Sequence, residues 1–318
     1  LQFDVALSAG GEWRTEIVTG IAPSGTAAAT AKTWTAAARV ARAREENRSH
    51  WMSISPGPFE VRTGDALWDP FLNIWLKKQI RTCCDWGRSA TYYHEGVGTF
   101  GFRNTAQDAF GILSIDPPRA KAMMVKLAEH QKNSGECMSG WSLETGPSLD
   151  RPTSDFPAWL PFLVNAYLKE TGDEKAIRDE IPYFDGDRGS LFDHCLRGLR
   201  FLQDRAKGAH GLPLMGTQDW NDALDRVGIG GKGESVMLAM QVAWCLGEMA
   251  DMADHLGDRE KAGECRERFD AMKKTINENA WDGSWYLMAY DDDGRPLGTG
   301  KDAECKIYLN TQSWAVIS

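Results

Sequence analysis

Two carboxylates and a tryptophan lie within four residues of one stretch, Asp219-Trp220-Asn221-Asp222. Gly and Pro bound this stretch, and a second glycine-rich turn follows it. Protonating a glycosidic oxygen needs a carboxylic acid with a raised pKa, and binding a sugar ring needs an aromatic face. Asp-rich loops are also common as solvated turns and helix caps. The residues alone therefore predict an acid at Asp219 or Asp222 without separating the two.

A longer set of motifs surrounds this stretch. It comprises Gly211-Leu-Pro-Leu-Met-Gly-Thr-Gln-Asp-Trp-Asn-Asp222, Arg226-Val-Gly228, Gly231-Lys-Gly-Glu-Ser-Val236, Trp86-Gly-Arg-Ser89, Gly101-Phe-Arg-Asn-Thr-Ala-Gln-Asp108 and Leu309-Asn-Thr-Gln-Ser-Trp-Ala-Val-Ile-Ser318. Over residues 60–318 the chain resembles glycoside hydrolase family 94. That family contains inverting phosphorylases of β-linked glucosides, such as cellobiose and chitobiose phosphorylase, and the C-terminal part of cyclic β-1,2-glucan synthase.

The resemblance implies a role for each site residue. Asp222 matches the general acid, and Asp219 is expected to fix the loop by accepting backbone N–H bonds. Arg103 and Asp108 match residues that hold hydroxyls of the non-reducing sugar, and Trp220 and Asp219 complete the predicted substrate-binding set. We expect Trp220 to stack on the sugar.

Other features qualify this assignment. Thr105 and Asp108 also fit a capping box at a helix start. Asn104 stands where the family often carries an Asp. Ser154-Asp155 aligns with a family Ser-Asp-Asp stretch, but Phe156 replaces its second Asp.

Thirteen tryptophans are an unusual excess. Trp141 and Trp159 lie near Gly, Pro or acidic residues, so they join Trp220 as candidates for stacking on sugars. The other ten are assigned to the core.

The number of carboxylates separates hydrolysis from phosphorolysis. An inverting hydrolase needs an acid and a base that activates water. A phosphorylase needs only the acid, because phosphate is already an anionic nucleophile and is held by cations and donors. One strong acid candidate and the resemblance favour phosphorolysis of a β-linked glucoside to α-glucose 1-phosphate and a shortened acceptor. Inorganic phosphate is then a co-substrate and no cofactor is expected. A glucan hydrolase and a non-catalytic glucan-binding part of a cyclic β-1,2-glucan synthase are the alternatives.

The phosphate site is the least defined part of this prediction. In the family, a histidine and a Thr/Gly-containing loop that grip phosphate follow the Gln-Ser-Trp-Ala-Val-Ile-Ser motif, so we expect them beyond Ser318. Arg88 is a local cation for the pocket, although a salt bridge on a helix surface explains it equally well. We therefore expect this chain alone to be weakly active or inactive. The variable stretch from Tyr92 to Gly96 does not reveal linkage or acceptor.

Composition limits the partners. A net charge of −9 with no basic run argues against nucleic acid. No apolar stretch approaches the roughly 20 residues of a membrane span, and no signal peptide opens the chain. Seven cysteines without a C-x-x-C motif indicate a reducing compartment and core packing. The six histidines include no pair at i, i+3 or i, i+4, so no metal is expected. The predicted location is cytoplasmic, and a homodimer is compatible with the family.

Hydrophobic spacing predicts a mostly helical chain. Residues 1–22 alternate loosely and predict two short strands, whereas residues 24–48 predict an exposed helix. Asp116-Pro117 has the pattern of a helix start, and Gly172 of a helix end. Further helices are expected near 191–202, 236–256 and 262–276, and a strand at 285–290.

The resemblance implies an (α/α)6 toroid, or barrel, preceded by a β-sandwich and a helical linker. We expect residues 1–22 to end the sandwich, 23–60 to form the linker and 61–318 the catalytic barrel. Because about eight to ten helices are predicted instead of about twelve, we expect the barrel to be incomplete and truncated at its C-terminus. The Gly228-Ile-Gly-Gly-Lys-Gly233 stretch matches G-x-G-x-x-G, but no strand precedes it, so we interpret it as a flexible lead-in to the helix near Glu234.

Overall fold

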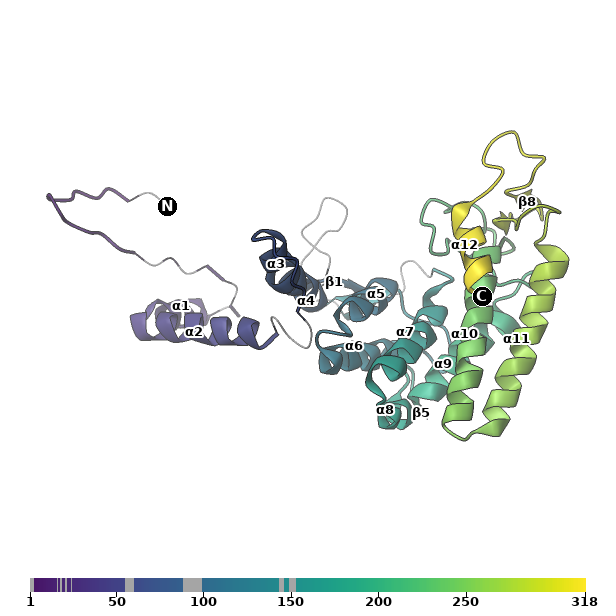
Figure 1. Cartoon of the computed structure of the whole chain (residues 1–318), viewed down its shortest axis with the longest axis horizontal. Helices are drawn as coiled ribbons and strands as arrows, with labels where there is room; N and C mark the ends of the chain where they lie inside the picture. Colours follow the sequence, from purple (N-terminus) through teal and green to yellow (C-terminus); the bar gives the residue numbers. More distant parts are fainter. Residues whose placement is uncertain are drawn as a thin grey trace. The chain divides into compact units, whose positions relative to one another are not determined.

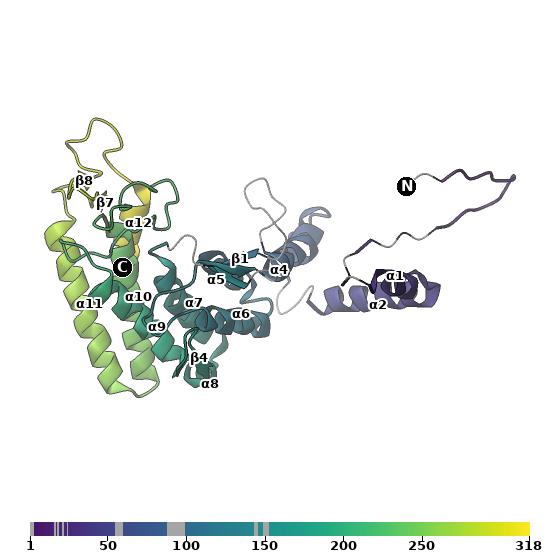
Figure 2. The ribbon, with the colours of Figure 1, turned by 180° about the vertical axis from the view of Figure 1, so that it is seen from behind.

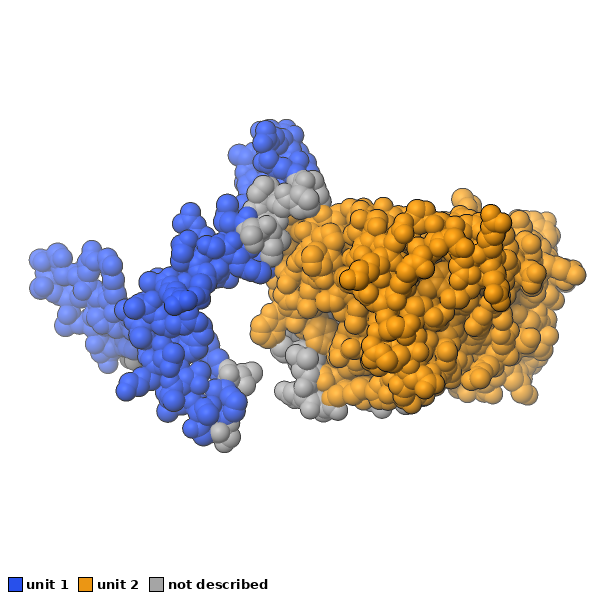
Figure 3. Space-filling view, turned by 90° about the horizontal axis from the view of Figure 1, so that it is seen from below, with its two compact units in different colours: residues 1–75 blue, residues 76–318 orange. Residues whose placement is uncertain are grey.

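The computed structural model describes residues 3–15, 17, 19–20, 22–23, 25–54, 60–87, 99–142, 146–148 and 153–318. Contacts divide the chain into two compact units, unit 1 (residues 1–75) and unit 2 (residues 76–318), coloured blue and orange in Figure 3. The predicted division at residues 22 and 60 stays a prediction. All the predicted site residues belong to unit 2, so that unit carries the functional argument.

Unit 1 contains helices and extended segments. Its elements are α1 (Ala27–Thr35), α2 (Ala37–Ile54), α3 (Trp68–Pro70) and the π-helical turn η1 (Phe71–Trp75). The helix predicted at residues 24–48 is therefore confirmed, although the extended backbone of Ala36 (ψ 122°) divides it. The two strands predicted within residues 1–22 are wrong for the described part of that segment. The rings of Phe3 and Trp13 lie there with their centroids 5.3 Å apart. Both side chains are nearly half exposed, whereas a β-sandwich would bury them between its two sheets.

Unit 2 is mostly helical, as predicted. Its helices are α4 (Leu76–Trp86), α5 (Phe102–Ile112), α6 (Pro117–Glu129), α7 (Phe156–Thr171), α8 (Glu174–Arg178), α9 (Leu191–Arg200), the π-helical turn η2 (Phe201–Arg205), α10 (Val236–His255), α11 (Arg259–Asn279) and α12 (Leu309–Ile317). Neighbouring helices pack in pairs, α5 with α6 and α10 with α11, and α7 contacts α5, α6, α9 and α10. The long α10–α11 pair is visible from both sides in Figures 1 and 2. The closed ring of six hairpins stays a prediction.

Small antiparallel sheets join the helices. They are β1–β2–β3 (Thr99–Gly101, Gly140–Ser142, Gly146–Ser148), β4–β5 (Glu180–Pro182, Arg188–Ser190) and β6–β7–β8 (Glu234–Ser235, Ala289–Tyr290, Pro296–Leu297). The strand predicted at residues 285–290 is therefore confirmed only for β7. Trp285 lies before the strand and donates its indole N–H to the Gly298 carbonyl, 2.9 Å away.

Local capping chemistry fixes several helix ends. Asp116 accepts the Arg119 N–H at 3.1 Å ahead of Pro117, and Gly172 ends α7 with φ 67°, so both predicted boundaries are confirmed. The predicted capping box of Thr105 and Asp108 is wrong. The Phe102 N–H donates to the Ser139 carbonyl at 2.9 Å, and α5 therefore begins at Phe102, which places Thr105 inside the helix.

Inward-facing apolar side chains form one large core. The largest fully buried ones include Phe102, Met124, Leu163, Leu196 and Leu202, from α5, α6, α7, α9 and η2. Each contributes about 1.5–3 kcal/mol by leaving water. A smaller cluster consists of Met215, Val227, Met237, Met288 and Ala289. Its members flank the 219–222 stretch and the start of α10, so this cluster supports the loop on which the candidate acid lies.

The cysteines and tryptophans test the predicted core. Five of the seven cysteines are buried as expected, whereas Cys305 is exposed. The tryptophan assignment was wrong in both directions. Trp141 and Trp159, expected to offer a sugar-binding face, are at most 9% exposed. Six tryptophans assigned to the core are more than one-third exposed, namely Trp13, Trp34, Trp68, Trp75, Trp86 and Trp281. Among the described residues, no helix is long and apolar enough to cross a membrane.

Candidate active site

Arg103 lies at the centre of the candidate site. It is the second residue of α5, and its side chain is only 12% exposed. Its Nη1 donates to Asp155 Oδ2 and to the Asp219 carbonyl, both at 3.1 Å, and its Nη2 donates to Asp222 Oδ1 at 2.6 Å. One guanidinium thus joins α5, the start of α7 and the 219–222 stretch. Burial lowers the pKa of Arg103, but the charges of Asp155 and Asp222 outweigh burial, so the net shift is upward.

Asp222 is the accessible carboxylate of this arrangement. Its side chain is 67% exposed, whereas Asp155 and Asp219 are fully buried. Oδ1 accepts hydrogen bonds from Arg103 and from Gln218 Nε2, the latter at 2.8 Å. Oδ2 accepts no hydrogen bond from the part of the chain that the structure describes. Asp222 is therefore held in place through one oxygen while most of its side chain stays exposed, an arrangement that leaves the carboxylate within reach of a ligand.

Asp219 is used inside the loop instead. Oδ1 accepts the Asn221 N–H at 2.7 Å, and Oδ2 accepts the Ser235 hydroxyl at 2.6 Å. Burial raises the pKa of Asp219 to about 6, while these two hydrogen bonds act against the shift. The contact with Asn221 agrees with the predicted role of Asp219 in fixing the loop. Its contact with substrate stays a prediction. The buried carboxylate offers no exposed surface for such a contact.

Asp155 is a site residue to which the sequence gave no role. It precedes α7, and its Oδ2 accepts the indole N–H of Trp159 at 2.7 Å as well as the Arg103 contact. Burial raises the pKa of Asp155, and the charge of Arg103 opposes that shift. Oδ1 has no hydrogen-bond partner among the described residues. The only sequence signal was the aligned Ser154-Asp155 pair, because the contact with Arg103 spans 52 residues.

Backbone contacts hold the loop from both sides. Ser154 donates its N–H to the Gln218 carbonyl at 3.0 Å, and Met215 donates to Gly233 at 2.7 Å. Buried Glu234 accepts the backbone N–H groups of His210 and Leu212 and lies 2.5 Å from His210 Nδ1. Backbone and side-chain groups of the chain itself therefore hold the loop in place.

The glycine loop (residues 228–233) is held by a carboxylate from a distant part of the chain. Its backbone N–H groups at Gly230, Lys232 and Gly233 donate to the Asp292 carboxylate at 2.6, 2.9 and 2.9 Å. These hydrogen bonds lower the pKa of Asp292. A nest of N–H groups can bind phosphate, but here Asp292 already satisfies it. The loop leads into β6 and then α10, as the sequence predicts, and Asp292 holds three of its amides; its flexibility stays a prediction.

The remaining predicted residues lie around this centre or outside the described chain. Trp220 is 46% exposed beside the acid and remains the stacking candidate. Asp108 is partly buried on α5, five residues or about 140° of helix away from Arg103. Its carbonyl accepts the Cys84 thiol at 3.6 Å, and its role with substrate stays a prediction. Arg88 and the Tyr92–Gly96 stretch lie outside the described residues.

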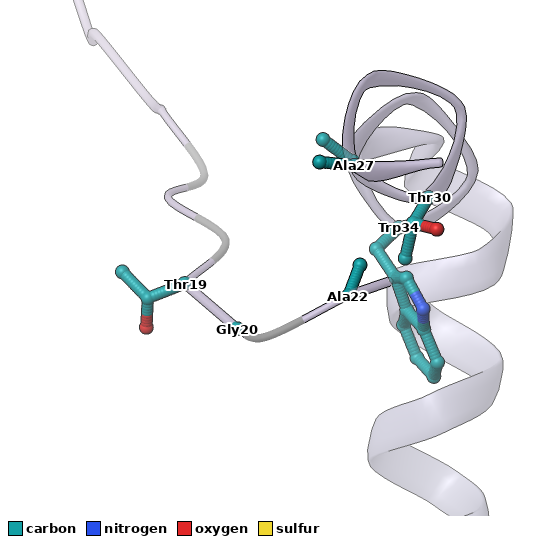
Figure 4. Close-up of a pocket in the computed structure, with 7 residues that line it drawn as sticks. Thr19, Gly20, Ala22, Ala27, Thr30 and Trp34 are labelled. Atoms are coloured by element: carbon teal, nitrogen blue, oxygen red, sulfur yellow. The ribbon is translucent and has the colours of Figure 1, made fainter. Parts of the chain in front are cut away.

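Other parts of the described chain offer no comparable set of reactive side chains. Among the described residues, no group of three or more His, Cys, Asp or Glu side chains is placed to hold a metal. The pocket in Figure 4 belongs to unit 1 and is lined by residues such as Thr19, Thr30 and Trp34. Its lining includes no charged side chain and none of the predicted site residues. The Arg103 centre therefore remains the strongest candidate.

The structure is a mostly helical domain in which one buried guanidinium joins two buried carboxylate residues to an exposed one. A rhamnosidase of family GH78 from Bacillus sp. GL1 has a similar fold, with a TM-score of 0.54, 16% identity and coverage of 74% of this chain and 23% of that one. The chain belongs to the glycosyl hydrolase 94 superfamily, because the model of its catalytic domain matches residues 50–318.

Curated relatives agree with this family. The solabiose phosphorylase of Paenibacillus borealis is 37% identical over 81% of this chain and 32% of its own length. The 3-O-β-D-glucopyranosyl-β-D-glucuronide phosphorylase of the same organism is 32% identical over 100% of this chain and 41% of its own length. The cyclic β-(1,2)-glucan synthase NdvB of Rhizobium meliloti is 31% identical over 87% of this chain and 10% of its own length. The chain thus spans less than half the length of these relatives.

Proposed function

We propose that this chain carries the general acid of an inverting phosphorylase that acts on β-linked glucosides. The observation that carries the proposal is the asymmetry around Arg103, where Asp222 is two-thirds exposed while Asp155 and Asp219 are buried. The family and the phosphorylase relatives support it. Inorganic phosphate is the co-substrate of the proposed reaction, which needs no cofactor.

The proposed reaction is a single displacement. Phosphate attacks the anomeric carbon from the face opposite the leaving group, the bond from that carbon to the glycosidic oxygen breaks, and Asp222 gives its proton to that oxygen. The products are α-glucose 1-phosphate and the shortened acceptor. Trp220 stacks on a sugar ring, and Arg103 and Asp108 hold hydroxyls. Asp155 and Asp219 are too buried to activate a water molecule, which favours phosphate over water as the nucleophile.

The test uses the longest natural polypeptide that contains this chain. It is assayed with β-1,2-, β-1,3- and β-1,4-linked glucosides, with and without phosphate, for release of α-glucose 1-phosphate. Asp222→Asn should lower kcat about 10²–10⁴-fold, the usual contribution of a general acid. Asp225→Asn, an exposed carboxylate three residues away, is the matched control and should leave kcat unchanged. Retained activity in Asp222→Asn would remove Asp222 from the acid role.

The NdvB relative supports a second candidate, a glucan-binding part of a cyclic β-1,2-glucan synthase. In that case the same panel would show binding of β-1,2-glucan that survives Asp222→Asn, with no turnover. Release of free glucose without phosphate would instead identify a hydrolase.

A further inference from the structure

Asp292 makes a contact that the proposed reaction does not use. Its two carboxylate oxygens accept three backbone N–H groups of the glycine loop, from residues 59 to 62 positions earlier in the chain. We propose that Asp292 is a positioning residue, which holds the glycine loop and thereby keeps the preceding site segment (residues 217–227) in the conformation that presents Trp220 and Asp222. This inference rests on the function proposed above for those two residues.

The glycine loop lies against the two ends of the site segment. A Cβ atom on Gly228 would lie 2.7 Å from Met215 Cβ and 2.9 Å from the Gly216 carbonyl oxygen. A Cβ atom on Gly233 would lie 2.3 Å from the Val227 carbonyl oxygen. The Met215 N–H donates to the Gly233 carbonyl at 2.7 Å. Because only glycine allows such close approaches, the start and the end of the site segment meet at this loop.

The β7–β8 hairpin, whose turn carries Asp292, also contacts the site segment through apolar side chains. Leu224 and Val227 pack in the small cluster that contains Met288, next to β7, and Leu297 of β8. The hairpin thus contacts the segment through this cluster and the glycine loop through Asp292. The three parts form a closed set of contacts, so a change at Asp292 should reach the segment that carries the candidate acid.

The turn that carries Asp292 is ordered by its own hydrogen bonds. Asp291 Oδ1 accepts the N–H groups of Asp293 and Arg295 at 2.9 and 2.8 Å, and the Gly294 N–H donates to the Asp291 carbonyl at 2.9 Å. The carboxylate of Asp292 therefore loses little freedom when it accepts the loop amides. One exposed hydrogen bond is weak because water competes for it. Here three amides must leave one fixed carboxylate together before the loop can move.

Two different substitutions break this contact. Asp292→Ala removes the carboxylate. Gly230→Ala keeps it but adds a Cβ atom 2.8 Å from Asp292 Oδ2, so the carboxylate must move away from the amides. Gly230 has no positive φ, so its backbone accepts alanine. Asp293→Ala is the matched control, because Asp293 is exposed and its carboxylate pairs with Arg295.

The first measurement is kcat/KM for phosphorolysis of a β-linked glucoside by the longest natural polypeptide that contains the chain. In Asp292→Ala it should fall about tenfold, since a misplacement of about 1 Å can cost up to roughly 10²-fold. Gly230→Ala should show a similar loss, and Asp293→Ala none. Because both substitutions break one contact, the double variant should lose no more than Asp292→Ala alone. Losses that multiply in the double variant, or an unchanged kcat/KM in Asp292→Ala, would overturn the proposal.

Asp292→Asn should give an intermediate result. Oδ1 accepts the N–H groups of Lys232 and Gly233, and Oδ2 accepts that of Gly230. An asparagine has one acceptor oxygen in place of two, so at the Oδ1 position it keeps two of the three hydrogen bonds. We therefore expect its kcat/KM to lie between those of the wild type and Asp292→Ala.

The second measurement needs no turnover. Backbone hydrogen exchange of the same polypeptide is followed by mass spectrometry. In Asp292→Ala, peptides from residues 217–227 and 228–233 should exchange faster, whereas peptides from α10 and α11 should keep their rates. Faster exchange in residues 228–233 alone, or throughout α10 and α11 as well, would overturn the inference. If residues 217–227 respond as expected but the wild type releases no α-glucose 1-phosphate, the positioning role stands and the proposed function fails.

Discussion

Ser235 connects the candidate site to α10, a 20-residue helix most of whose residues are buried, so its removal should be unusually costly. Its hydroxyl donates to Asp219 Oδ2 at 2.6 Å and accepts the Leu238 N–H at 3.0 Å, at the start of α10. Ser235 and Asp219 are fully buried. Ser235→Ala removes a helix cap and leaves a buried carboxylate oxygen without its donor.

The magnitude follows from these two contacts. Loss of a helix N-cap costs about 1 kcal/mol. Loss of a hydrogen bond to a buried charged group costs about 1.5–3 kcal/mol. Since both are lost together, we expect the free energy of unfolding of Ser235→Ala to fall by roughly 3 kcal/mol.

The chain provides a matched control at Ser190. Its hydroxyl donates to Asp193 Oδ2 at 2.6 Å and accepts the Asp193 N–H at 3.1 Å, at the start of α9. Asp193 is 39% exposed, so in Ser190→Ala water can donate to its carboxylate in place of the lost serine hydroxyl. We expect that variant to lose about 1 kcal/mol. The two substitutions then differ by about 2 kcal/mol through burial alone.

The assay is urea unfolding of the 318-residue chain at pH 7.5, followed by far-ultraviolet circular dichroism. If the slopes agree, the shift in midpoint gives the change in stability. The excess cost of Ser235→Ala should shrink below pH 6, because Asp219 then binds a proton. Equal losses for the two serine variants at pH 7.5 would refute this account of the buried contact.

Two further outcomes follow from the same loop. The folded-state pKa of Asp219, about 6, lies above its unfolded value near 3.9. The folded chain therefore binds more protons between pH 4 and 6, and the stability contributed by Asp219 is lost as the pH rises through that window, by roughly 3 kcal/mol. Asp219→Asn should lack this part of the slope in urea unfolding from pH 4 to 7, and an unchanged slope would contradict the raised pKa. Asp292→Ala should speed hydrogen exchange at the amides of Gly230 and Gly233, whereas Asp293→Ala should not. Unaltered protection in Asp292→Ala would show that the glycine loop is held by other contacts.

Helix boundaries could be predicted from the sequence because their causes are local. Asp116, three residues from the amide that it caps, and Gly172, with its positive φ, are visible as short patterns. The capping box at Thr105 failed because a distant group, the Ser139 carbonyl, decides where α5 begins. The tryptophan assignment failed for a related reason. Hydrophobicity predicts that a ring can be buried, but tertiary packing decides which rings are.

The site was only partly predictable. The motif and the family resemblance pointed to Asp222, Arg103 and Trp220, whose roles with substrate stay predictions, and the residues alone could not separate Asp222 from Asp219. Burial separates them, and burial is a property of the folded chain. The aligned Ser154-Asp155 pair drew attention to Asp155, but its contact with Arg103 could not be predicted, because the two residues lie 52 positions apart. The phosphate-binding residues and the linkage that is cleaved stay predictions.

The separation of the site residues along the chain also constrains how the site forms during synthesis. Arg103 can meet Asp155 once 52 further residues have emerged, but its bond to Asp222 spans 119 residues. The glycine loop depends on a still later residue, since Asp292 follows Gly230 by 62 residues. Because the chain is synthesised from its N-terminus, Arg103 and Asp155 are both present in the nascent chain before Asp222 has been added. A nascent chain paused before Asp292 would display a row of unsatisfied amides, a feature that a chaperone or a stray anion could capture.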